Sequence, residues 1–562
     1  MGMLQASRRV SINPVYGLQV VVAMGCVLLP VGLQGYFQFV DRGMDYYGLA
    51  VIFFAALWLR VRWPVEWCLP GVFVACGFSG YMVSQRDDIG YNEISAVLNT
   101  KWDEALAVAC IPSMAISLGV AIGVFAVLSW ALCSKALRAR FRKPLLVPTL
   151  LLYAIMAVCG GGYLATGSAW NKQQMYPVNV MREGYGFIRE VQYAKATYAQ
   201  IHYTYAGPPA THGPSALTAI LVIGESARAA SWSLYGYPRL TNPQVADCLN
   251  LACGRGVVFR DALSAGRLTM NSVPSMLSPT QAKDFRDYCA TPSVIRVFRA
   301  AGYRTGVISS QIRGSEFWDG PVNLMLSDTA SVEKLEQDDQ LPKALDRWLG
   351  RDAQPRQLAV VHLAGSHYNY SDRYPERFNR FHGGNEMVDT YDNSIVFTDD
   401  VLARLMARVD AMPTPAVMFY SSDHGENLND FGDGNIQHSC REFTRYEIEV
   451  PMLFFANQAF ADAYPQELGA IRSCQDRPVS HDNISQTLMG LADLADPAVY
   501  LPQCDLSSAR FAPQPRFLIK NLRESVAEAI VRATPHGARL TPKAVVDATG
   551  VQAHRETTSP DG

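Results

Sequence analysis

The sequence predicts two parts: an N-terminal transmembrane domain of about five helices, and a C-terminal α/β domain with a mostly parallel sheet. The chain has 562 residues, which is too long for one ordinary domain. Its first part, to about Thr166, is dominated by long apolar stretches. In the remainder, short apolar runs alternate with helical patterns, and this alternation is typical of a doubly wound α/β domain.

The apolar stretches of the first part predict five membrane spans. These are Tyr16–Val40, Tyr47–Val61, Trp67–Val83, Ala105–Cys133 and Leu145–Thr166. The second and third are short, because a span takes about 20 residues. Arg8 and Arg9 precede the first span, and basic residues also cluster between the fourth and fifth. These positive charges predict a cytoplasmic N-terminus, and five crossings then place everything after Thr166 outside the membrane.

Composition divides the chain into four segments. They are a transmembrane domain (1–166), an interfacial linker (167–215), an α/β domain that carries the chemistry (216–508) and a polar tail (509–562). The linker is rich in tyrosine, and amphipathic aromatic side chains favour the membrane–water boundary. A plain soluble helical connector is an equally good interpretation of this segment. We assign no function to the tail.

Charge and cysteine usage limit the functional classes. The net charge is −2, so there is no electrostatic case for binding nucleic acid. An even number of cysteines lies outside the predicted spans, which is compatible with disulfides in an oxidising compartment. These six residues are Cys248, Cys253, Cys289, Cys440, Cys474 and Cys504. The first two are near enough in sequence to pair; the alternative is that several are ordinary buried thiols.

Three apolar runs lead directly into residues that bind divalent metals. "ALTAILVIG" is followed by Glu225, "QLAVVHLAGS" by His367, and "PAVMFYSS" by Asp423 and His424. In an open parallel sheet the chemistry lies outside the carboxyl ends of the strands, so we expect these side chains to meet at one edge. Two carboxylates and one imidazole suit zinc better than magnesium. A single Asp-His pair is more often structural, but several such positions on one edge favour a metal site.

Several segments of the α/β part resemble one family. "IGESARAASWSLYGYPRLTNP" (Ile223–Pro243) resembles the signature of the bacterial phosphoethanolamine transferases, which include the mobile colistin-resistance enzymes. Four further motifs are similar to those of the family: "SVPSMLS" (Ser272–Ser278), "HLAGSHYNYSDRYPERF" (His362–Phe378), "YDNSIVFTDDVL" (Tyr391–Leu402) and "SSDHGENL" (Ser421–Leu428). "SDHGE" alone indicates only the wider phosphatase and sulfatase superfamily. The resemblance implies an alkaline-phosphatase/sulfatase-like fold for the C-terminal domain.

The resemblance also implies a set of site residues. Glu225, Asp423 and His424 match the zinc-ligand positions, and the family nucleophile is a Thr that completes the zinc shell and carries phosphoethanolamine covalently. His367 matches the His of the family's "GSH" motif, and His438 stands where a His follows "DHGE". Both are expected near the phosphate or a second zinc ion.

The nucleophile segment departs from the best-known pattern. Many members read "SCGTST" where this chain has "SAGRLT", so that Arg267 falls on the usual Thr position and Thr269 on the second Thr. Other branches of the family carry a single Thr that matches Thr269, and we therefore assign the nucleophile to it. Ser264 and Ser272 are weaker candidates. The two Cys that bracket the usual motif are absent, as expected if one disulfide is missing.

A second departure lies in the predicted membrane domain. The family has a periplasm-facing Asn-x3-Thr-x3-Glu set that contacts the lipid headgroup. Thr100 and Glu104 match this pattern, but the Asn position is Ala96. Asn92, one helical turn earlier, and Asn99, adjacent to Thr100, are the candidate substitutes.

The implied enzyme transfers phosphoethanolamine from phosphatidylethanolamine to lipid A or another envelope glycan, with one or two Zn²⁺ ions. The resemblance and the predicted topology together imply a multi-pass protein of the bacterial inner membrane with its catalytic domain in the periplasm. Two alternatives remain: a catalytically inactive lipid sensor of the same fold, and a membrane-anchored sulfatase or phosphodiesterase. A sulfatase needs a "CxPxR"-like motif, and none occurs near the nucleophile segment.

Overall fold

The computed structural model describes ten ranges of the chain: 178–207, 216–252, 254–281, 285–311, 320–329, 331–351, 354–432, 436–438, 443–521 and 524–528. The five predicted spans and the candidate headgroup residues Asn92, Asn99, Thr100 and Glu104 lie outside these ranges. Within them, no helix has both the length and the apolar character needed to cross a membrane. The chain divides into two compact units, and everything described from Phe187 onward belongs to the second.

A seven-stranded sheet forms the centre of the second unit, in the order β2-β10-β7-β1-β6-β4-β5. Its strands are β1 (Leu217–Gly224), β2 (Gly256–Val258), β4 (Arg304–Ser309), β5 (Val332–Lys334), β6 (Arg356–His362), β7 (Ala416–Ser422) and β10 (Met452–Ala456). The five strands from β7 to β5 run parallel to one another, and β10 and β2 complete the sheet with antiparallel pairings. The predicted mostly parallel α/β sheet is therefore confirmed.

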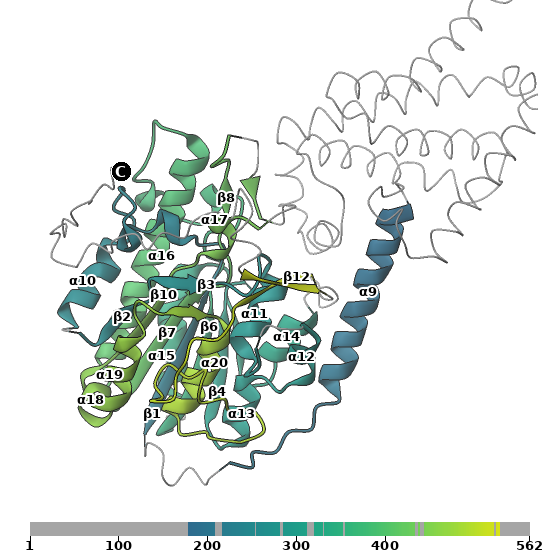
Figure 1. Cartoon of the computed structure of the whole chain (residues 1–562). Helices are drawn as coiled ribbons and strands as arrows, with labels where there is room; N and C mark the ends of the chain where they lie inside the picture. The colour runs from purple at the N-terminus through teal and green to yellow at the C-terminus, as the bar shows by residue number, and fades with distance from the viewer. Residues whose placement is uncertain are drawn as a thin grey trace, which may run out of the picture. The chain divides into compact units, whose positions relative to one another are not determined.

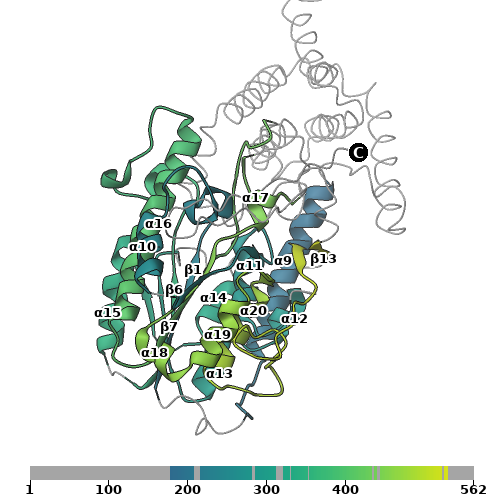
Figure 2. The same cartoon turned by 60° about the vertical axis from the view of Figure 1, so that its left-hand side comes forward.

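Helices cover both faces of this sheet (Figures 1 and 2). On one face lie α10 (Pro243–Leu251), α15 (Leu341–Gly350) and α16 (Glu386–Asp410); on the other lie α11 (Thr269–Leu277), α13 (Val294–Ala300) and α20 (Asp482–Leu491). Shorter or peripheral helices are α12 (Phe285–Ala290), α14 (Gly320–Leu326), α17 (Arg445–Ile448), α18 (Gln458–Ala463) and α19 (Pro465–Ser473). Because β1 and β7 are buried on both faces, their residues are mostly apolar, as the sequence runs indicated; Thr218, Ser421 and Ser422 are the buried polar exceptions.

Three two-stranded sheets complete the described fold. They pair β3 (Asp261–Leu263) with β11 (Pro478–Ser480), β8 (Asn427–Leu428) with β9 (Ile436–Gln437), and β12 (Phe517–Asn521) with β13 (Glu524–Ala527). The last pair lies in the segment that the sequence indicated only as a polar tail. It is therefore an ordered hairpin, whose packing is described below.

The predicted linker contains a long helix, α9 (Val178–Ala199). Its last turn is anchored to the α/β domain, because the buried Tyr198 hydroxyl donates to Asp328 and accepts a hydrogen bond from the Ser293 N–H. The extended residues that follow are held at Asp496, which accepts from the Tyr203 hydroxyl at 2.6 Å. This end of the linker is therefore part of the second folded unit.

The four described cysteines, Cys248, Cys289, Cys474 and Cys504, form no disulfide with one another. Cys248 is a free thiol, so the pairing with Cys253 that their spacing allowed is not formed. The reason is local: Cys248 sits in α10 with its sulfur directed at the Ala403 carbonyl of α16, 3.9 Å away. Cys253 and Cys440 lie outside the described residues.

Candidate metal centre and nucleophile

Glu225, Asp423 and His424 meet at the carboxyl edge of the central sheet. Glu225 directly follows β1, and Asp423 and His424 directly follow β7. The two strands are parallel neighbours, and their last residues, Gly224 and Ser422, are paired in register. The residue that follows each strand must therefore lie beside its counterpart.

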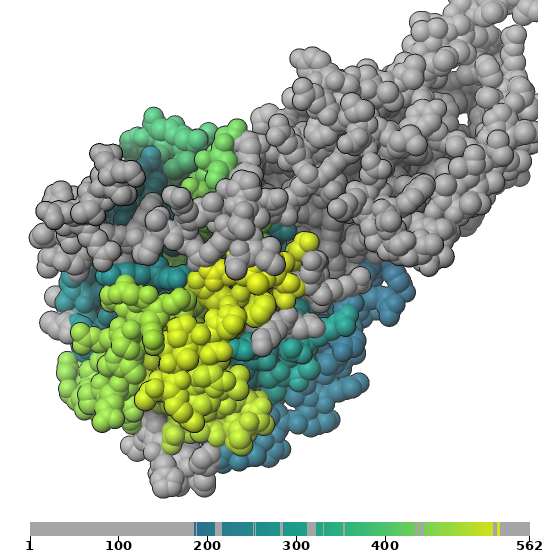
Figure 3. Space-filling model, viewed as in Figure 1, coloured from purple at the N-terminus to yellow at the C-terminus, as the bar shows by residue number. Residues whose placement is uncertain are grey.

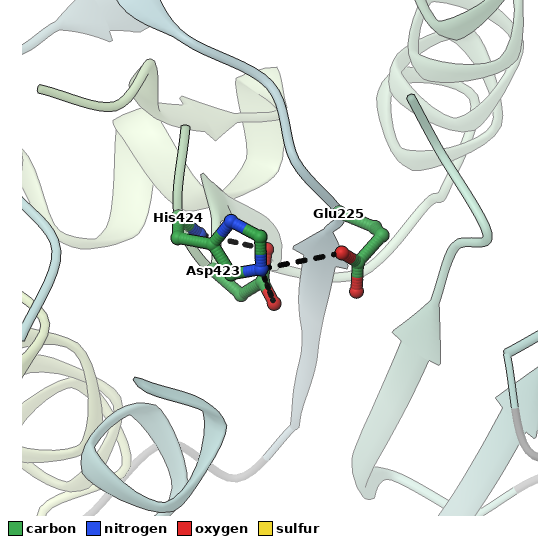
Figure 4. A group of neighbouring side chains, drawn as sticks. All are labelled: Glu225, Asp423 and His424. Atoms are coloured by element: carbon green, nitrogen blue, oxygen red, sulfur yellow. Dashed lines mark hydrogen bonds and ion pairs between the residues drawn. The ribbon is translucent and has the colours of Figure 1, made fainter. Parts of the chain in front are cut away.

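The three side chains point at one another (Figure 4). His424 Nε2 lies 3.4 Å from Glu225 Oε1 and 3.5 Å from Asp423 Oδ2. One ligand atom from each residue lies within 4.8 Å of the others, and this is the one such group of three among the described residues. Ligands about 2.0–2.1 Å from a tetrahedral zinc ion are separated by about 3.4 Å, so the spacing suits that coordination.

Burial concentrates charge at this point. All three side chains are inaccessible to solvent. Desolvation raises the pKa of both carboxyl groups, and the charge of Asp423 raises the pKa of Glu225 further. Burial alone would lower the pKa of His424, but the carboxylates beside it raise it to about 9.

Two hydrogen-bonding details favour a metal ion at this position. No described group donates a hydrogen bond to the buried Asp423 Oδ2. His424 Nδ1 lies 2.9 Å from the Gly425 carbonyl and donates to it, which directs Nε2 at the carboxylates. A metal-binding His commonly has its other ring nitrogen fixed in this way. The residues present therefore fit a divalent metal.

Thr269 brings a hydroxyl to the same place. It is the first residue of α11, and its Oγ donates to Glu225 Oε2 at 3.2 Å and lies 3.5 Å from His424 Nε2. The unpaired N–H groups at a helix N-terminus favour negative charge there. Thr269 is thus placed where a developing alkoxide or a phosphoryl oxygen would be stabilised.

The other candidate hydroxyls are engaged elsewhere. The Ser264 hydroxyl donates to the Asp423 carbonyl at 2.5 Å, and the Ser272 hydroxyl donates back to the Leu268 carbonyl in its own helix at 2.7 Å. The Arg267 side chain is buried with its guanidinium over the Phe443 ring, 4.9 Å from the centroid. Among the described contacts of the loop, Thr269 alone brings a side-chain hydroxyl to the carboxylate of Glu225.

His367 and His438 stand beside the triad. The His438 ring centroid lies 4.3 Å from that of His424 and 6.1 Å from that of His367. His438 Nδ1 is 3.1 Å from Glu426, a fully buried carboxyl. Burial raises the pKa of Glu426 to about 7, against the lowering effect of His424 and His367. Glu426 was not singled out from the sequence, although it is the last letter of the "SDHGE" motif.

Gln311 is a second residue that the sequence did not single out. It follows β4 by two residues, at the same edge of the sheet, and its Nε2 donates to Glu225 Oε2 at 3.1 Å. That oxygen therefore accepts from both Gln311 and Thr269. Its position after the apolar run "YRTGVISS" was the available signal, but an amide is a less common zinc ligand than a carboxylate, an imidazole or a thiolate.

The loop that carries His367 is fixed by a buried carboxylate and a glycine. Asp338 accepts hydrogen bonds from the N–H groups of Ala364 and Gly365, at 2.9 and 2.8 Å. Gly365 has a φ of +52°, and a Cβ there would lie 2.6 Å from the Glu225 carbonyl oxygen. Only glycine allows this close approach of the His367 loop to the Glu225 backbone.

Ser226 links the two metal-ligand strands. Its hydroxyl donates to Glu225 Oε1 at 2.7 Å, and its N–H donates to Asp423 Oδ1 at 3.1 Å. It does so with a positive φ of 55°, which is unusual for serine. The Tyr391 hydroxyl donates to the Ser226 carbonyl at 2.7 Å, so the α16 motif "YDNSIVFTDDVL" supports the site from behind.

Comparisons with known proteins concern the sequence and fold of the chain. Residues 218–494 match the family model described as Sulfatase. The chain is 29% identical over 301 residues to phosphoethanolamine transferase EptC of Escherichia coli O18:K1:H7, covering 50% of this chain and 51% of that protein. The chain thus spans about half the length of such curated relatives.

Two solved structures share the fold. The C-terminal periplasmic domain of EptC from Escherichia coli in complex with Zn is 24% identical, with a TM-score of 0.51, and covers 59% of this chain and 99% of that one. The integral membrane lipooligosaccharide phosphoethanolamine transferase A of Neisseria meningitidis is 18% identical, with a TM-score of 0.59, and covers 88% and 97%. At these identities the likeness concerns the fold.

Proposed function

We propose, from the premise that residues 218–494 are a sulfatase-family domain of the alkaline-phosphatase-like superfamily, that this protein is a zinc-dependent phosphoethanolamine transferase. Its donor is phosphatidylethanolamine, and its acceptor is lipid A or another glycolipid or glycan of the envelope. The observation that carries the proposal is the Thr269 hydroxyl, 3.2 Å from Glu225 at the edge of a buried Glu-Asp-His triad. A phosphoryl-transfer enzyme needs this combination of a nucleophile and a cation site.

Glu225, Asp423, His424 and Thr269 would hold the zinc ion. When bound, zinc lowers the pKa of a coordinated hydroxyl and offsets negative charge on phosphoryl oxygens. The orphaned Asp423 Oδ2 and the mixed oxygen and nitrogen donors support this assignment. The Zn complex of the EptC domain, which shares the fold, supports it as well.

The reaction has two balanced steps. In the first, Thr269 Oγ attacks the phosphorus of phosphatidylethanolamine, the bond from phosphorus to the glyceryl oxygen breaks, and diacylglycerol leaves with the proton that the threonine hydroxyl gives up. In the second, an acceptor hydroxyl or phosphate oxygen attacks the phosphothreonine, and the Thr269 oxygen is released and reprotonated. The covalent intermediate divides one difficult transfer into two easier ones.

His367 and His438 would serve the transferred group. His438 Nδ1 is 3.1 Å from Glu426, and His367 Nδ1 donates to the Tyr368 carbonyl at 2.8 Å. The second nitrogen of each ring is Nε2. That nitrogen can bind a phosphoryl oxygen, pass a proton to the leaving glyceryl oxygen, or coordinate a second zinc ion. We keep both roles, phosphate binding and second-metal binding, for these two residues.

The predicted membrane domain fits this chemistry, because the donor and a lipid acceptor both reside in a bilayer. The apolar N-terminal stretches support an inner-membrane protein with its catalytic domain in the periplasm. Thr100 and Glu104, with Asn92 or Asn99, would contact the phosphate and ammonium of the donor headgroup. The likeness of fold to the membrane enzyme of Neisseria meningitidis over 88% of this chain supports the same arrangement.

A hydrolytic sulfatase and an inactive lipid sensor are the competing functions. The family match at 218–494 supports the first, but no "CxPxR"-like formylglycine motif occurs beside Thr269, the first residue of α11. An inactive sensor would not need a hydroxyl hydrogen-bonded to a potential metal ligand. Both alternatives make measurable predictions that differ from those of a transferase.

The decisive experiment follows the first half-reaction. Purified full-length protein, loaded with zinc, is incubated with fluorescent phosphatidylethanolamine. A transferase releases diacylglycerol and gains the mass of one phosphoethanolamine group, which peptide mapping should place on Thr269. Thr269→Ala should abolish both signals, whereas Thr269→Ser, which keeps a hydroxyl, should retain part of the activity.

Controls separate the alternatives. Chelation should stop diacylglycerol release and zinc should restore it. A lipid sensor would release no diacylglycerol at all. A hydrolase would release free phosphoethanolamine continuously without needing an acceptor. An adduct that persists in Thr269→Ala and maps to Ser264 or Ser272 would refute the nucleophile assignment.

A further inference from the structure

The backbone of the nucleophile loop, residues 264–269, is held by two distant segments. The Ala265 N–H donates to His481 Nδ1 at 3.3 Å, and the Ala265 carbonyl accepts from the Ile519 N–H at 2.7 Å. Ala265 itself is buried, so neither polar group can turn to water instead. Both hydrogen bonds of this peptide therefore depend on residues more than 200 positions away.

One of these segments is the C-terminal hairpin β12–β13. Beyond the bond to Ala265, Ile519 forms an isolated parallel bridge with Gly266. Leu518 and Ile519 are fully buried, and Leu518 packs in a small apolar cluster with Leu263 and Ile448. Figure 1 shows β12 beside β3 and α11, the elements that flank the loop, and Figure 3 shows the last described residues, in yellow, lying against the rest of the domain.

Arg516 fastens the hairpin at its start. Its Nη1 donates to the Asp261 side chain at 2.8 Å and to the Val479 carbonyl at 3.1 Å, while Nε and Nη2 make a bidentate pair with Glu528 at 2.6 and 2.7 Å. Asp261 begins β3 and Val479 lies in β11, the strands that lead to Ser264 and His481. One guanidinium thus ties the hairpin to both strands that enter the loop region.

We propose that the hairpin β12–β13 is a positioning element for the Thr269 nucleophile. The inference rests on the proposed function of Thr269 and goes beyond it, because the hairpin lies outside residues 218–494, the range that matches the family model. The hairpin supplies no metal ligand. Its effect is to fix the Ala265–Gly266 backbone, from which the chain runs through Leu268 directly into the first turn of α11.

Positioning of this kind acts on the rate of attack rather than on metal binding. In-line attack requires the nucleophile within a few tenths of an ångström of its productive place, and a displacement of about 1 Å can cost about 100-fold in rate. Glu225, Asp423 and His424 are carried by β1 and β7, which the hairpin does not touch in its described hydrogen bonds. Loss of the hairpin contact should therefore separate zinc binding from adduct formation.

The test compares substitutions in the full-length protein. Ile519→Pro removes the one N–H that holds the Ala265 carbonyl, whereas Ile519→Ala keeps this donor and removes only side-chain packing. Arg516→Lys keeps the charge but loses the bidentate contact with Glu528. It is the second test variant, to be used if Ile519→Pro does not fold. Arg260→Gln is the matched control, because its partner Asp476 is largely exposed. Each variant is assayed for zinc content, single-turnover adduct formation and hydrogen exchange across residues 264–269.

We expect Ile519→Pro to retain wild-type zinc content and KM for phosphatidylethanolamine, with adduct formation slowed about 10- to 100-fold. Hydrogen exchange of the 264–269 amides should become at least about 10-fold faster. Arg516→Lys should lie between the wild type and Ile519→Pro in both rates. Ile519→Ala should stay closer to the wild type than Ile519→Pro in both rates. Arg260→Gln should have the same rates as the wild type. Wild-type adduct rates in Ile519→Pro and Arg516→Lys, while their hairpin amides exchange freely, would overturn the proposal.

Failure of the proposed function gives a different result. If the wild-type protein forms no adduct, Thr269 is not the nucleophile, and hydrogen exchange still decides whether the hairpin holds the loop. Unchanged protection of residues 264–269 in Ile519→Pro would then overturn the coupling itself. Faster exchange confined to this loop and the hairpin would support it without any measurement of activity.

Discussion

The metal-ligand edge and the nucleophile loop meet at one point, but they are held in opposite ways. Glu225 and Asp423 each follow a central strand of seven or eight residues whose hydrogen bonds and side chains are fully buried. The loop to Thr269 follows β3, a strand of three residues in a separate two-stranded sheet. It is fixed instead by His481, Ile519 and the Asp423 carbonyl.

This difference has a functional meaning. A ligand set on the central sheet is rigid and local, since displacing it requires breaking the ladder between β1 and β7. A nucleophile carried by a loop can be tuned by segments that never touch the metal. Preorganised sites combine both kinds of support. Zinc binding and nucleophile positioning should then respond to different substitutions.

The largest expected effects come from two substitutions, one at the metal-ligand edge and one at the nucleophile. Asp423→Asn keeps the size of the side chain but removes a charged ligand, so bound zinc should fall to a small fraction of one equivalent, and adduct formation with it. Thr269→Ala leaves Glu225, Asp423 and His424 in place and should keep most of its zinc, while adduct formation drops by at least about 1000-fold. Metal analysis and intact-mass measurement on the same samples test both.

The comparison would be wrong if the two variants behaved alike. Equal loss of zinc in both would mean that the Thr269 hydroxyl is as necessary for metal binding as the carboxylate. Full zinc content in Asp423→Asn would remove the triad from the mechanism. Asp430→Asn is a suitable control, because Asp430 pairs with Arg228 at 2.8 Å rather than with a triad member.

The two regions also differ in how far the sequence could predict them. The proximity of Glu225, Asp423 and His424 was predictable because each directly follows an apolar run, and parallel strands end at one edge. The same reasoning correctly gave a mostly parallel sheet. It did not give the reversed direction of β10, because the run "PMLFFAN" carries no mark of strand direction.

The support of Thr269 lay beyond sequence reasoning for a physical reason. His481 and Ile519 act through a ring nitrogen and a backbone N–H that reach Ala265 only after folding has joined segments more than 200 residues apart. Short strands such as β12 show too little periodicity to be recognised, and the hairpin was therefore indistinguishable from a polar tail. Contacts made by backbone groups leave no residue-type signature.

An effect of intermediate size is expected on zinc affinity when a residue that orients a metal ligand is changed. Gln311 donates to Glu225 Oε2 and so orients a ligand without being one. Partners of this kind typically contribute about 10- to 100-fold to metal affinity. Gln311→Ala should weaken zinc binding about 10-fold in a chelator competition, with little change in thermal stability. Gln281→Ala is the matched control, because its amide contacts Cys504, away from the triad; equal affinities in both variants would exclude a role for Gln311.

The smallest expected effect is on the pH dependence of stability. It involves two buried histidines, one at the carboxyl edge of the central sheet and one beside the nucleophile loop. His362, at the end of β6, has no hydrogen-bond partner for either ring nitrogen among the described residues, and burial lowers its pKa to about 4. His481 supports the nucleophile loop, and burial lowers its pKa to about 3, although the Ser422 carbonyl works against this. Both rings are therefore neutral in the folded state through the whole range in which an unfolded histidine, with a pKa near 6.5, becomes charged.

The sign of the resulting pH dependence follows from linkage. Below about pH 6.5 the unfolded chain binds a proton at each position that the folded chain does not, so stability falls as the pH falls, by about 1.4 kcal/mol per pH unit for each histidine. Above that pH neither contributes. His362→Leu should remove one of these slopes between pH 6.5 and about 4 without losing a hydrogen bond, so its unfolding temperature should drop less than that of the wild type between pH 7.5 and 5.0.

His481→Leu should lose a slope too, but from a lower stability at pH 7.5, because it also gives up the bonds to Ala265 and Ser422. Identical behaviour of the two variants at pH 7.5 would show that the loop does not depend on His481.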